Sequence, residues 1–165
     1  MNDKVYDIAV TYGRFNLLHK GHMRLFEKMS RKAGKLFIGM SSAKRNLPAH
    51  MRCESIKAAL VEYDIKASII DAGNPFEVFS AVNLPEAKIV TVFGTDQYTL
   101  ADAATKAYGW ESELVERLTS STAIRSHIDN EEWDILADLV PASIIPHVIN
   151  LRQIEHASLH TDKAS

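Results

Sequence analysis

The sequence has one cysteine and no long apolar run. Cys53 alone cannot form an internal disulfide, so we expect a reducing, cytoplasmic location. The longest apolar stretches, such as residues 89–93, fall far short of the roughly 20 residues that a membrane-spanning helix requires. The polar N-terminus offers no hydrophobic core for a signal peptide, and we therefore expect no membrane partner.

An excess of basic residues is also lacking, since 19 Lys and Arg stand against 21 Asp and Glu. The net charge of −2 excludes a general DNA- or RNA-coating surface, so we expect no nucleic-acid partner, but it allows a local basic pocket. No G-x-G-x-x-G or G-K-[ST] string occurs, which excludes the usual dinucleotide and P-loop sites. Dense Cys, His or carboxylate clusters are missing too, and we predict no dedicated metal site.

The composition is that of a soluble globular protein, with 46% hydrophobic and 24% charged residues. A chain of 165 residues fits one compact domain. We expect this domain to cover residues 1–155. Residues 156–165 are polar and lack helical periodicity, which predicts a mobile tail.

Short β-branched runs alternate along the chain with segments of helical periodicity. The predicted strands cover residues 5–11, 36–40, 67–70, 88–93 and 113–118, and the predicted helices cover residues 21–32, 49–62, 75–82 and 96–108. A further helix begins near Ser121, and residues 131–155 carry two helical patterns separated around Pro141. This alternation predicts an α/β fold with a doubly wound parallel sheet, whose ligands bind beyond the carboxyl ends of the strands.

The last two helical patterns contain apolar residues that either close the domain or form a subunit interface. These residues are Trp133, Leu136, Leu139, Ile144 and Ile145. The sequence by itself leaves both interpretations open.

A first candidate phosphate site follows the first predicted strand, where residues 13–22 read G-R-F-N-L-L-H-K-G-H. Gly13 permits a tight exit from the strand close to a ligand. His19 and His22 flank Gly21 at the start of the first predicted helix. The helix dipole and free amides favour an anion there, and two imidazoles can donate hydrogen bonds to it.

This string resembles the H-x-G-H signature of the nucleotidylyltransferase superfamily. Its longer form, G-R-F-N-x-x-H-x-G-H, is similar to nicotinamide mononucleotide adenylyltransferases in particular. Residues 119–125, which read T-S-S-T-A-I-R, resemble the family's I-S-S-T-x-I-R signature. The hydroxyls of Ser120, Ser121 and Thr122 suit helix capping or phosphate binding, and Arg125 reaches the same anion from one turn further. The resemblance implies a Rossmann-like nucleotidylyltransferase fold.

Two segments between these motifs extend the resemblance. Residues 92–96, V-F-G-T-D, look like the family's V-x-G-x-D segment and add Gly94 and Asp96 to the candidate nucleotide-binding residues. The loop of residues 42–48, with Arg52 beyond it, resembles the basic loop after the family's second strand. Leu17 departs from the pattern, since many relatives carry proline there.

The resemblance implies that an acceptor's phosphate attacks the α-phosphorus of ATP or CTP and that pyrophosphate leaves. It assigns His19 and His22 to the triphosphate and to the charge that develops at the α-phosphate. Arg125, with the hydroxyls of residues 120–122, is assigned to the β- and γ-phosphates. The implied cofactor is Mg²⁺, held mainly through the triphosphate, because magnesium needs few protein ligands in such sites.

Further candidate contacts carry both a functional and a structural interpretation. Besides Gly13, Phe15 and Gly21, the candidate nucleotide-binding residues include Arg14 and Lys44, the latter with Arg45 or Arg52. Basic runs are also commonly solvated surfaces. Asp96 either contacts the acceptor or nucleoside or caps its helix, and Trp110 either stacks on a base or belongs to the core.

The leading functional prediction is adenylyl transfer to nicotinamide mononucleotide, giving NAD. The alternative is a cytidylyltransferase acting on glycerol phosphate or phosphoethanolamine, although such relatives begin G-T-F and carry R-T-x-G-I-S-T-T, and this chain has neither. Phosphopantetheine and flavin mononucleotide are weaker candidates as acceptors. A catalytically silent nucleotide-binding module remains an alternative of another class. Relatives are commonly oligomers, so we expect a homo-oligomer.

Overall fold

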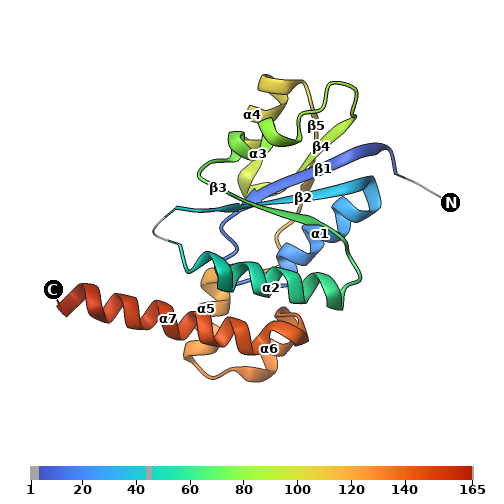
Figure 1. Ribbon diagram of the computed structural model, residues 1–165. Helices are drawn as coiled ribbons and strands as arrows, with labels where there is room; N and C mark the ends of the chain where they lie inside the picture. Colours follow the sequence, from blue (N-terminus) through green and yellow to red (C-terminus); the bar gives the residue numbers. More distant parts are fainter. Residues whose placement is uncertain (1–3, 44–45, 165) are drawn as a thin grey trace.

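The computed structural model describes residues 4–43 and 46–164 of the chain. Within these ranges, five parallel strands form one sheet in the order β3-β2-β1-β4-β5 (Figure 1). The strands are β1 (Tyr6–Gly13), β2 (Ala33–Ser41), β3 (Ser68–Ala72), β4 (Ile89–Gly94) and β5 (Glu111–Val115). The order reverses between β1 and β4, which confirms the predicted doubly wound parallel sheet.

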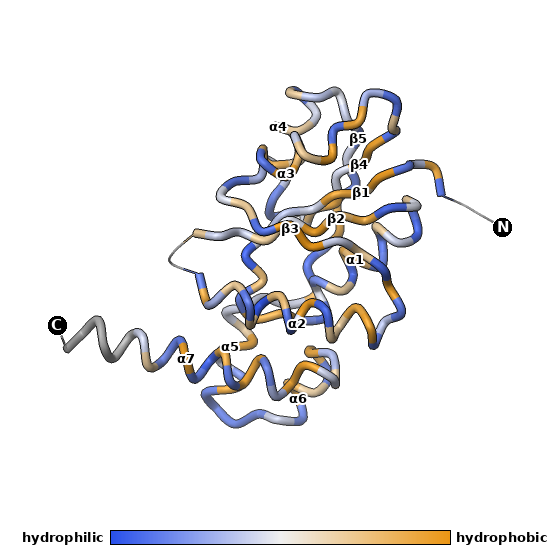
Figure 2. Tube along the Cα trace, in the orientation of Figure 1, coloured by the Kyte–Doolittle hydropathy of each residue, from blue (hydrophilic) through white to orange (hydrophobic). Residues whose placement is uncertain are grey.

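Helices cover both faces of the sheet. The helices α1 (Lys20–Lys32) and α2 (Ala49–Glu62) lie on one side, and α3 (Pro75–Val82) and α4 (Tyr98–Tyr108) lie on the other (Figure 1). Ile8 and Val10 of β1 pack with α3 and α4, whereas Ala9 packs with α1 and α2, because successive strand side chains point to opposite faces. Figure 2 shows hydrophobic stretches along β1 and β2, as expected for strands covered on both sides.

Three more helices form an outer layer against α2. They are α5 (Ser121–Asp129), α6 (Trp133–Leu139) and α7 (Ile145–Ala164), and Figure 1 shows them below α1 and α2. Leu136 and Ile144 are buried in the same core cluster as α1 and α2, so these two residues close the domain. Trp133 is exposed. The interpretation that the segment closes the domain therefore holds for Leu136 and Ile144.

Some elements differ in extent from the sequence prediction. The strand β5 covers Glu111–Val115 instead of residues 113–118, because its pairing with β4 begins at Glu111 and ends at Val115, opposite Gly94. Residues 116–120 are consequently a loop and not a strand end. The helix α7 runs through residues 156–164, where the sequence shows no helical periodicity, and His156 hydrogen-bonds to Asp129.

The carboxyl ends of the inner strands meet at one edge of the sheet. Gly13 at the end of β1 pairs with Met40 of β2, and Gly94 at the end of β4 pairs with Val115 of β5. The loops that follow β1, β4 and β5 therefore converge at the point where strand order reverses. Ligands bind in that position in open α/β sheets.

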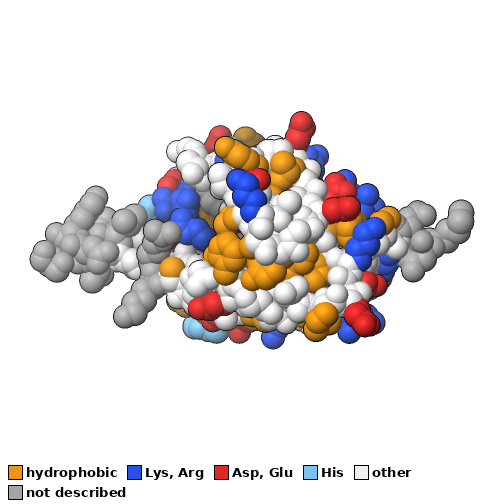
Figure 3. All heavy atoms as spheres, turned by 90° about the horizontal axis from the view of Figure 1, so that it is seen from above, with side chains coloured by type: hydrophobic (Ala, Val, Ile, Leu, Met, Phe, Trp, Pro, Cys, Tyr) orange, Lys and Arg blue, Asp and Glu red, His pale blue; other side chains and the backbone are white. Residues whose placement is uncertain are grey.

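The surface above α3 and α4 is partly apolar. Hydrophobic side chains gather in the middle of this face, with charged side chains around them (Figure 3). Phe76, Leu84 and Tyr98, which belong to this layer and its loops, are exposed. No helix in the described ranges is long and apolar enough to span a lipid bilayer.

Candidate active site

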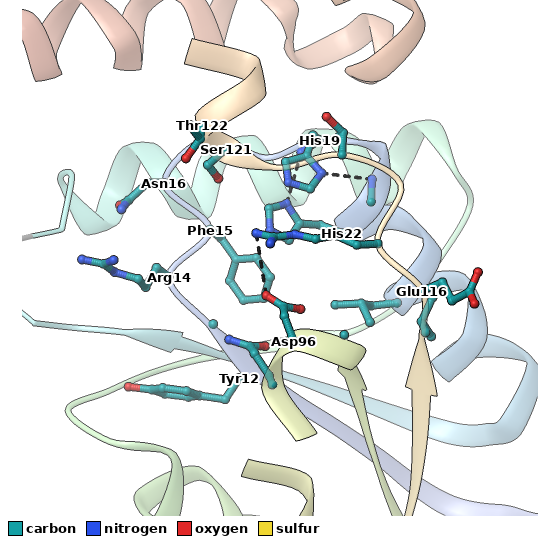
Figure 4. Close-up of a pocket in the computed structure, with 18 of the residues that line it drawn as sticks. Tyr12, Arg14, Phe15, Asn16, His19, His22, Asp96, Glu116, Ser121 and Thr122 are labelled. Carbon is teal, nitrogen blue, oxygen red and sulfur yellow. Dashed lines mark hydrogen bonds and ion pairs between the residues drawn. The ribbon is translucent and has the colours of Figure 1, made fainter. Parts of the chain in front are cut away.

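A cavity of about 370 Å³ opens beyond the carboxyl ends of β1, β4 and β5. Four segments line it: the loop from β1 into α1, the start of the short helix after β4, the loop after β5, and the first turns of α5 (Figure 4). It therefore brings together motifs that lie about a hundred residues apart in the sequence. The predicted site residues that line it are Gly13, Arg14, Phe15, His19, Gly21, His22, Gly94, Asp96, Ser121, Thr122 and Arg125.

Two stacked histidines form the wall of the cavity at the start of α1. The rings of His19 and His22 lie 3.9 Å apart between centroids. His19 Nδ1 accepts a hydrogen bond from the Gly21 amide at 3.0 Å, and His22 Nδ1 accepts one from the His19 amide at 3.2 Å. This is a reciprocal capping box built from imidazoles. Because both Nδ1 atoms accept, each neutral ring carries its proton on Nε2 and is a donor there.

Gly21 is required between the histidines by close packing. A Cβ atom at this position would lie 2.7 Å from His19 Cε1 and 2.8 Å from His19 Nδ1. Any larger residue would push the His19 ring away from its hydrogen bond to the Gly21 amide. The glycine of the H-x-G-H string thus fixes the orientation of the first histidine.

Phe15 supports the second histidine from below. Its ring is buried and meets the His22 ring edge to face at a centroid distance of 5.1 Å. Phe15 has a φ of 51°, in the left-handed region that non-glycine residues seldom occupy. A Cβ on Gly13 would lie 3.0 Å from the Phe15 ring, so the glycine makes room for this fold of the chain.

Arg52 joins the motif loop after β1 to the loop after β2. It is only 2% exposed, and its guanidinium donates to the backbone carbonyls of Leu47, Arg14 and Ser41 at 2.7, 2.9 and 2.8 Å. Asn16 Oδ1 also accepts the Leu47 amide at 3.0 Å. Arg52 is not among the residues that line the cavity, and its hydrogen bonds support a role in holding two loops together over a role as a phosphate contact.

On the opposite side of the cavity, Asp96 and Arg117 form an ion pair. Arg117 Nη2 lies 3.7 Å from Asp96 Oδ2, and both residues line the cavity. The Asp96 carboxylate folds back over Gly94, where a Cβ would lie 2.6 Å from Asp96 Oδ1. Gly94 therefore allows the carboxylate to face the cavity, as Figure 4 shows.

The start of α5 forms the remaining wall. Ser120 is the N-cap of α5, and its hydroxyl accepts the Ala123 amide at 3.0 Å. Ser120 does not line the cavity, whereas Ser121, Thr122 and Arg125 do. Within the S-S-T string, the capping position is thus distinct from the positions that line the cavity.

Two other predicted contacts lie outside the site. Trp110 is 8% exposed and stacks on Tyr108 at 4.5 Å, within the core cluster of α3 and α4. It directly precedes β5 and so lies at the amino end of the sheet, which corrects its interpretation as a stacking platform for a base. Lys44 and Arg45 lie outside the described residues.

The structure adds residues that the motifs did not indicate. Arg117, Glu116 and Gln97 line the cavity. The sequence predicts Arg117 near the end of a strand. Because β5 already ends at Val115, Arg117 lies in the loop that follows it. Asn16, by contrast, lies inside the first motif, where its side-chain hydrogen bond to a distant loop has no sequence signal.

Burial sets the protonation of the histidine pair. Desolvation, followed by the positive charge of Arg117, lowers the pKa of His19 to about 4. Desolvation also lowers the pKa of His22 well below its usual value, with His19 and Arg117 adding to the effect. Both imidazoles are therefore neutral at pH 7 and act as Nε2–H donors.

This lowered pKa predicts that acid destabilises the fold. The unfolded chain takes up the His19 proton near pH 6.5 while the folded protein resists until about pH 4, so stability is lost as pH falls through this window. From His19 alone we expect the free energy of unfolding to drop by about 2 kcal/mol between pH 7 and pH 5. Urea unfolding at pH 7, 6 and 5 measures the drop. His19→Asn, which keeps a capping acceptor, should lose this share of the pH dependence, and parallel slopes in both proteins would contradict the assignment.

A family comparison agrees with this geometry. The family model described as cytidylyltransferase-like matches residues 10–138. The chain belongs to this family. The match runs from β1 to α6 and so contains both sequence motifs and every wall of the cavity.

Solved structures with the same fold include three that are described as adenylyltransferases. A protein from Vibrio parahaemolyticus described as a nicotinate-nucleotide adenylyltransferase is 17% identical, with a TM-score of 0.70 over 88% of this chain and 94% of that one. A bifunctional NMN adenylyltransferase/ADP ribose pyrophosphatase from Francisella tularensis is 20% identical, with a TM-score of 0.65 over 77% of this chain and 43% of that one. A Plasmodium falciparum nicotinic acid mononucleotide adenylyltransferase, complexed with NaAD, is 10% identical, with a TM-score of 0.63 over 87% of this chain and 95% of that one.

At these identities, the likeness establishes a shared fold alone. No curated protein is significantly similar to the chain in sequence. The assignment of the site to a reaction consequently depends on its geometry.

Proposed function

We propose that the protein transfers an adenylyl group from ATP to nicotinamide mononucleotide, giving NAD and pyrophosphate. The observation that carries the proposal is the convergence of two helix starts on one cavity. The stacked pair His19 and His22 begins α1, and Ser121, Thr122 and Arg125 begin α5. Two helix N-termini with added donors suit a triphosphate.

In the proposed reaction, a phosphate oxygen of the acceptor forms a bond to the α-phosphorus of ATP. The bond from the α-phosphorus to the bridging oxygen of the β-phosphate breaks, and the electron pair leaves with pyrophosphate. The nucleophile is already an anion, so no protein base is needed. Catalysis rests on positioning and on stabilising the charge that develops in the transition state.

His19 and His22 are proposed to donate Nε2–H hydrogen bonds to the α-phosphate oxygens. Neutral imidazoles with a fixed tautomer are suited to this task, because their donors are oriented before the substrate arrives. Arg125, with the hydroxyls and amides of Ser121 and Thr122, is proposed to bind the β- and γ-phosphates. These two phosphates leave as pyrophosphate, and they gain negative charge as the bond breaks.

Arg14 and Arg117 supply two further positive charges around the same cavity. Arg14 is held by a hydrogen bond from its Nε to Asn46 Oδ1 at 3.0 Å, and Arg117 is held by Asp96. We propose that both contact phosphate groups of the reactants. Asp96 then remains available to accept a hydrogen bond from the acceptor or the nucleoside.

Mg²⁺ is proposed to bind mainly through the triphosphate. Among the described residues, no three His, Cys, Asp or Glu side chains are grouped to hold a metal ion. Asp96 and Glu116 are the carboxylates that line the cavity. This sparse set fits an ion that keeps most of its ligands from phosphate and water. When bound, Mg²⁺ neutralises phosphate charge, while the protein side chains orient the reactants.

The proposal is tested by measuring pyrophosphate release from each of ATP, CTP, GTP and UTP with Mg²⁺. The acceptors are nicotinamide mononucleotide, nicotinic acid mononucleotide, glycerol 3-phosphate, phosphoethanolamine, phosphopantetheine and flavin mononucleotide. We expect release only with ATP and nicotinamide mononucleotide. Release with nicotinic acid mononucleotide alone would replace the proposed acceptor. Release with CTP and a phosphorylated alcohol would replace the proposal with the cytidylyltransferase. ATP binding without release from any pair would support the silent nucleotide-binding module.

We also propose that the protein is a cytoplasmic homo-oligomer. Trp133 and Ile135 of α6 are exposed, which supports a subunit contact in the segment where the sequence offers one, and the lone cysteine suits a reducing compartment. A monomeric mass in multi-angle light scattering at micromolar concentration would contradict the oligomer.

A further inference from the structure

The motif arginine of α5 is held from behind by the C-terminal helix. Arg125 donates from Nε to both carboxylate oxygens of Glu155, at 2.9 and 3.1 Å, and from Nη2 to Glu155 Oε2 at 2.8 Å. Glu155 lies on α7, 30 positions further along the chain, in a segment that carries no motif. The pair is a bidentate fork, the geometry in which arginine and carboxylate bind most specifically.

Glu155 is itself held in place. It is half-buried, and Arg152 Nη1 donates to its Oε1 at 3.1 Å. Arg152 in turn donates to Asp129 of α5, from Nε at 3.0 Å and from Nη2 at 2.6 Å. His156 also contacts Asp129, at 3.1 Å. The hydrogen bond from Arg152 lowers the pKa of Asp129, so this carboxylate stays charged.

These five side chains form one network between α5 and α7. Arg125 and Asp129 are one turn apart on α5, and Arg152, Glu155 and His156 share the facing turns of α7. Arg125 is thus held by Glu155, and Glu155 is linked through Arg152 to Asp129 of α5. The guanidinium has five N–H bonds, and those of Nε and Nη2 on one edge donate to Glu155. Within the described ranges, the structure shows no acceptor for the N–H bonds of Nη1. Arg125 nevertheless lines the cavity.

We propose that Glu155 is a positioning residue, which orients the Arg125 guanidinium so that its remaining N–H bonds face the triphosphate. This inference rests on the proposed function. An arginine side chain has about 2 kcal/mol of rotamer entropy, and a partner that fixes it in advance removes this cost from ligand binding. Hydrogen bonds from a carboxylate outside a site commonly hold a binding residue in the orientation that the ligand needs.

The test is calorimetric binding of ATP with Mg²⁺ to the full-length protein and to Glu155→Gln, Glu155→Asp and Asp138→Asn. Asp138 is an exposed carboxylate of α6 and provides a matched loss of charge. We expect Glu155→Gln to weaken ATP binding about tenfold, Glu155→Asp to recover part of the loss, and Asp138→Asn to bind like the wild type. In steady-state kinetics, the KM for ATP should rise while the KM for the acceptor stays within twofold.

A double-mutant cycle separates positioning from general stability. In an Arg125→Ala background, Glu155→Gln should cause no further loss of ATP binding, because Glu155 acts through that arginine. An additional loss there, or unchanged binding in Glu155→Gln alone, would overturn the inference. Tighter binding in Glu155→Gln would also overturn it, since Glu155 would then compete with the triphosphate. A wild-type protein that binds no ATP would instead refute the proposed function itself, which distinguishes the two failures.

Discussion

Replacing His22 with asparagine is expected to lower kcat by about 10²- to 10³-fold while leaving the protein folded. The Nε2–H donor of His22 is the group proposed to meet the charge on the α-phosphate, and losing one such preorganised donor typically costs this much. Asparagine keeps an acceptor in the place of Nδ1, so the hydrogen bond from the His19 amide can persist. The measurement is steady-state pyrophosphate release at saturating ATP and acceptor, with thermal unfolding of the same sample.

Two further variants make this result specific. In the His22→Gln variant, the side-chain amide nitrogen of glutamine lies near the position of the histidine Nε2 atom. This variant should therefore recover part of the lost kcat. His50 is an exposed histidine of α2, and His50→Asn should retain wild-type kcat. A His22→Asn enzyme within a factor of three of wild type would remove His22 from the transition state and leave it a role in capping α1.

The local parts of the site could be predicted from the sequence because they depend on short spacings. His19 and His22 are three residues apart, and that spacing alone builds the capping box at the start of α1. The same holds for Ser120 as the cap of α5. Its hydroxyl accepts the Ala123 amide and its carbonyl accepts the Ile124 amide, so the cap depends on residues three and four positions away. The alternation of strands and helices likewise predicted the parallel sheet, since period and length are local properties.

The long-range parts could not be predicted in this way. Arg125 and Glu155 meet only because α7 packs beside α5, and no spacing links residues that are 30 positions apart on different helices. Arg117 entered the cavity because pairing with β4 ends β5 at Val115, a tertiary effect that overrides local β-propensity. By contrast, the end of the sheet at which Trp110 lies was predictable. A residue that directly precedes a parallel strand lies at the amino end of the sheet, away from the site at the carboxyl ends.

Replacing Arg52 with methionine is expected to lower the free energy of unfolding by about 3 kcal/mol. Arg52 is almost fully buried and donates to three backbone carbonyls, those of Leu47, Arg14 and Ser41. Replacing a buried charge with an apolar residue often costs nothing when its partner is replaced as well. Here the partners are main-chain carbonyls that remain in place. The Ser41 carbonyl keeps a hydrogen bond from Asn46 Nδ2 at 3.2 Å, but the Leu47 and Arg14 carbonyls lose the Arg52 donor. A buried acceptor left without a donor costs about 1–3 kcal/mol. This penalty exceeds the relief from burying methionine in place of a guanidinium.

Urea unfolding of Arg52→Met and Arg24→Met measures this difference. Arg24 is exposed on α1, and its replacement should change stability by less than about 0.5 kcal/mol. ATP binding to Arg52→Met should weaken as well, because the loops that carry Arg14 and Leu47 lose their common anchor. The two readouts decide between two roles for Arg52. A phosphate ligand would lose ATP affinity at unchanged stability, whereas a loop anchor must lose stability in the absence of any nucleotide.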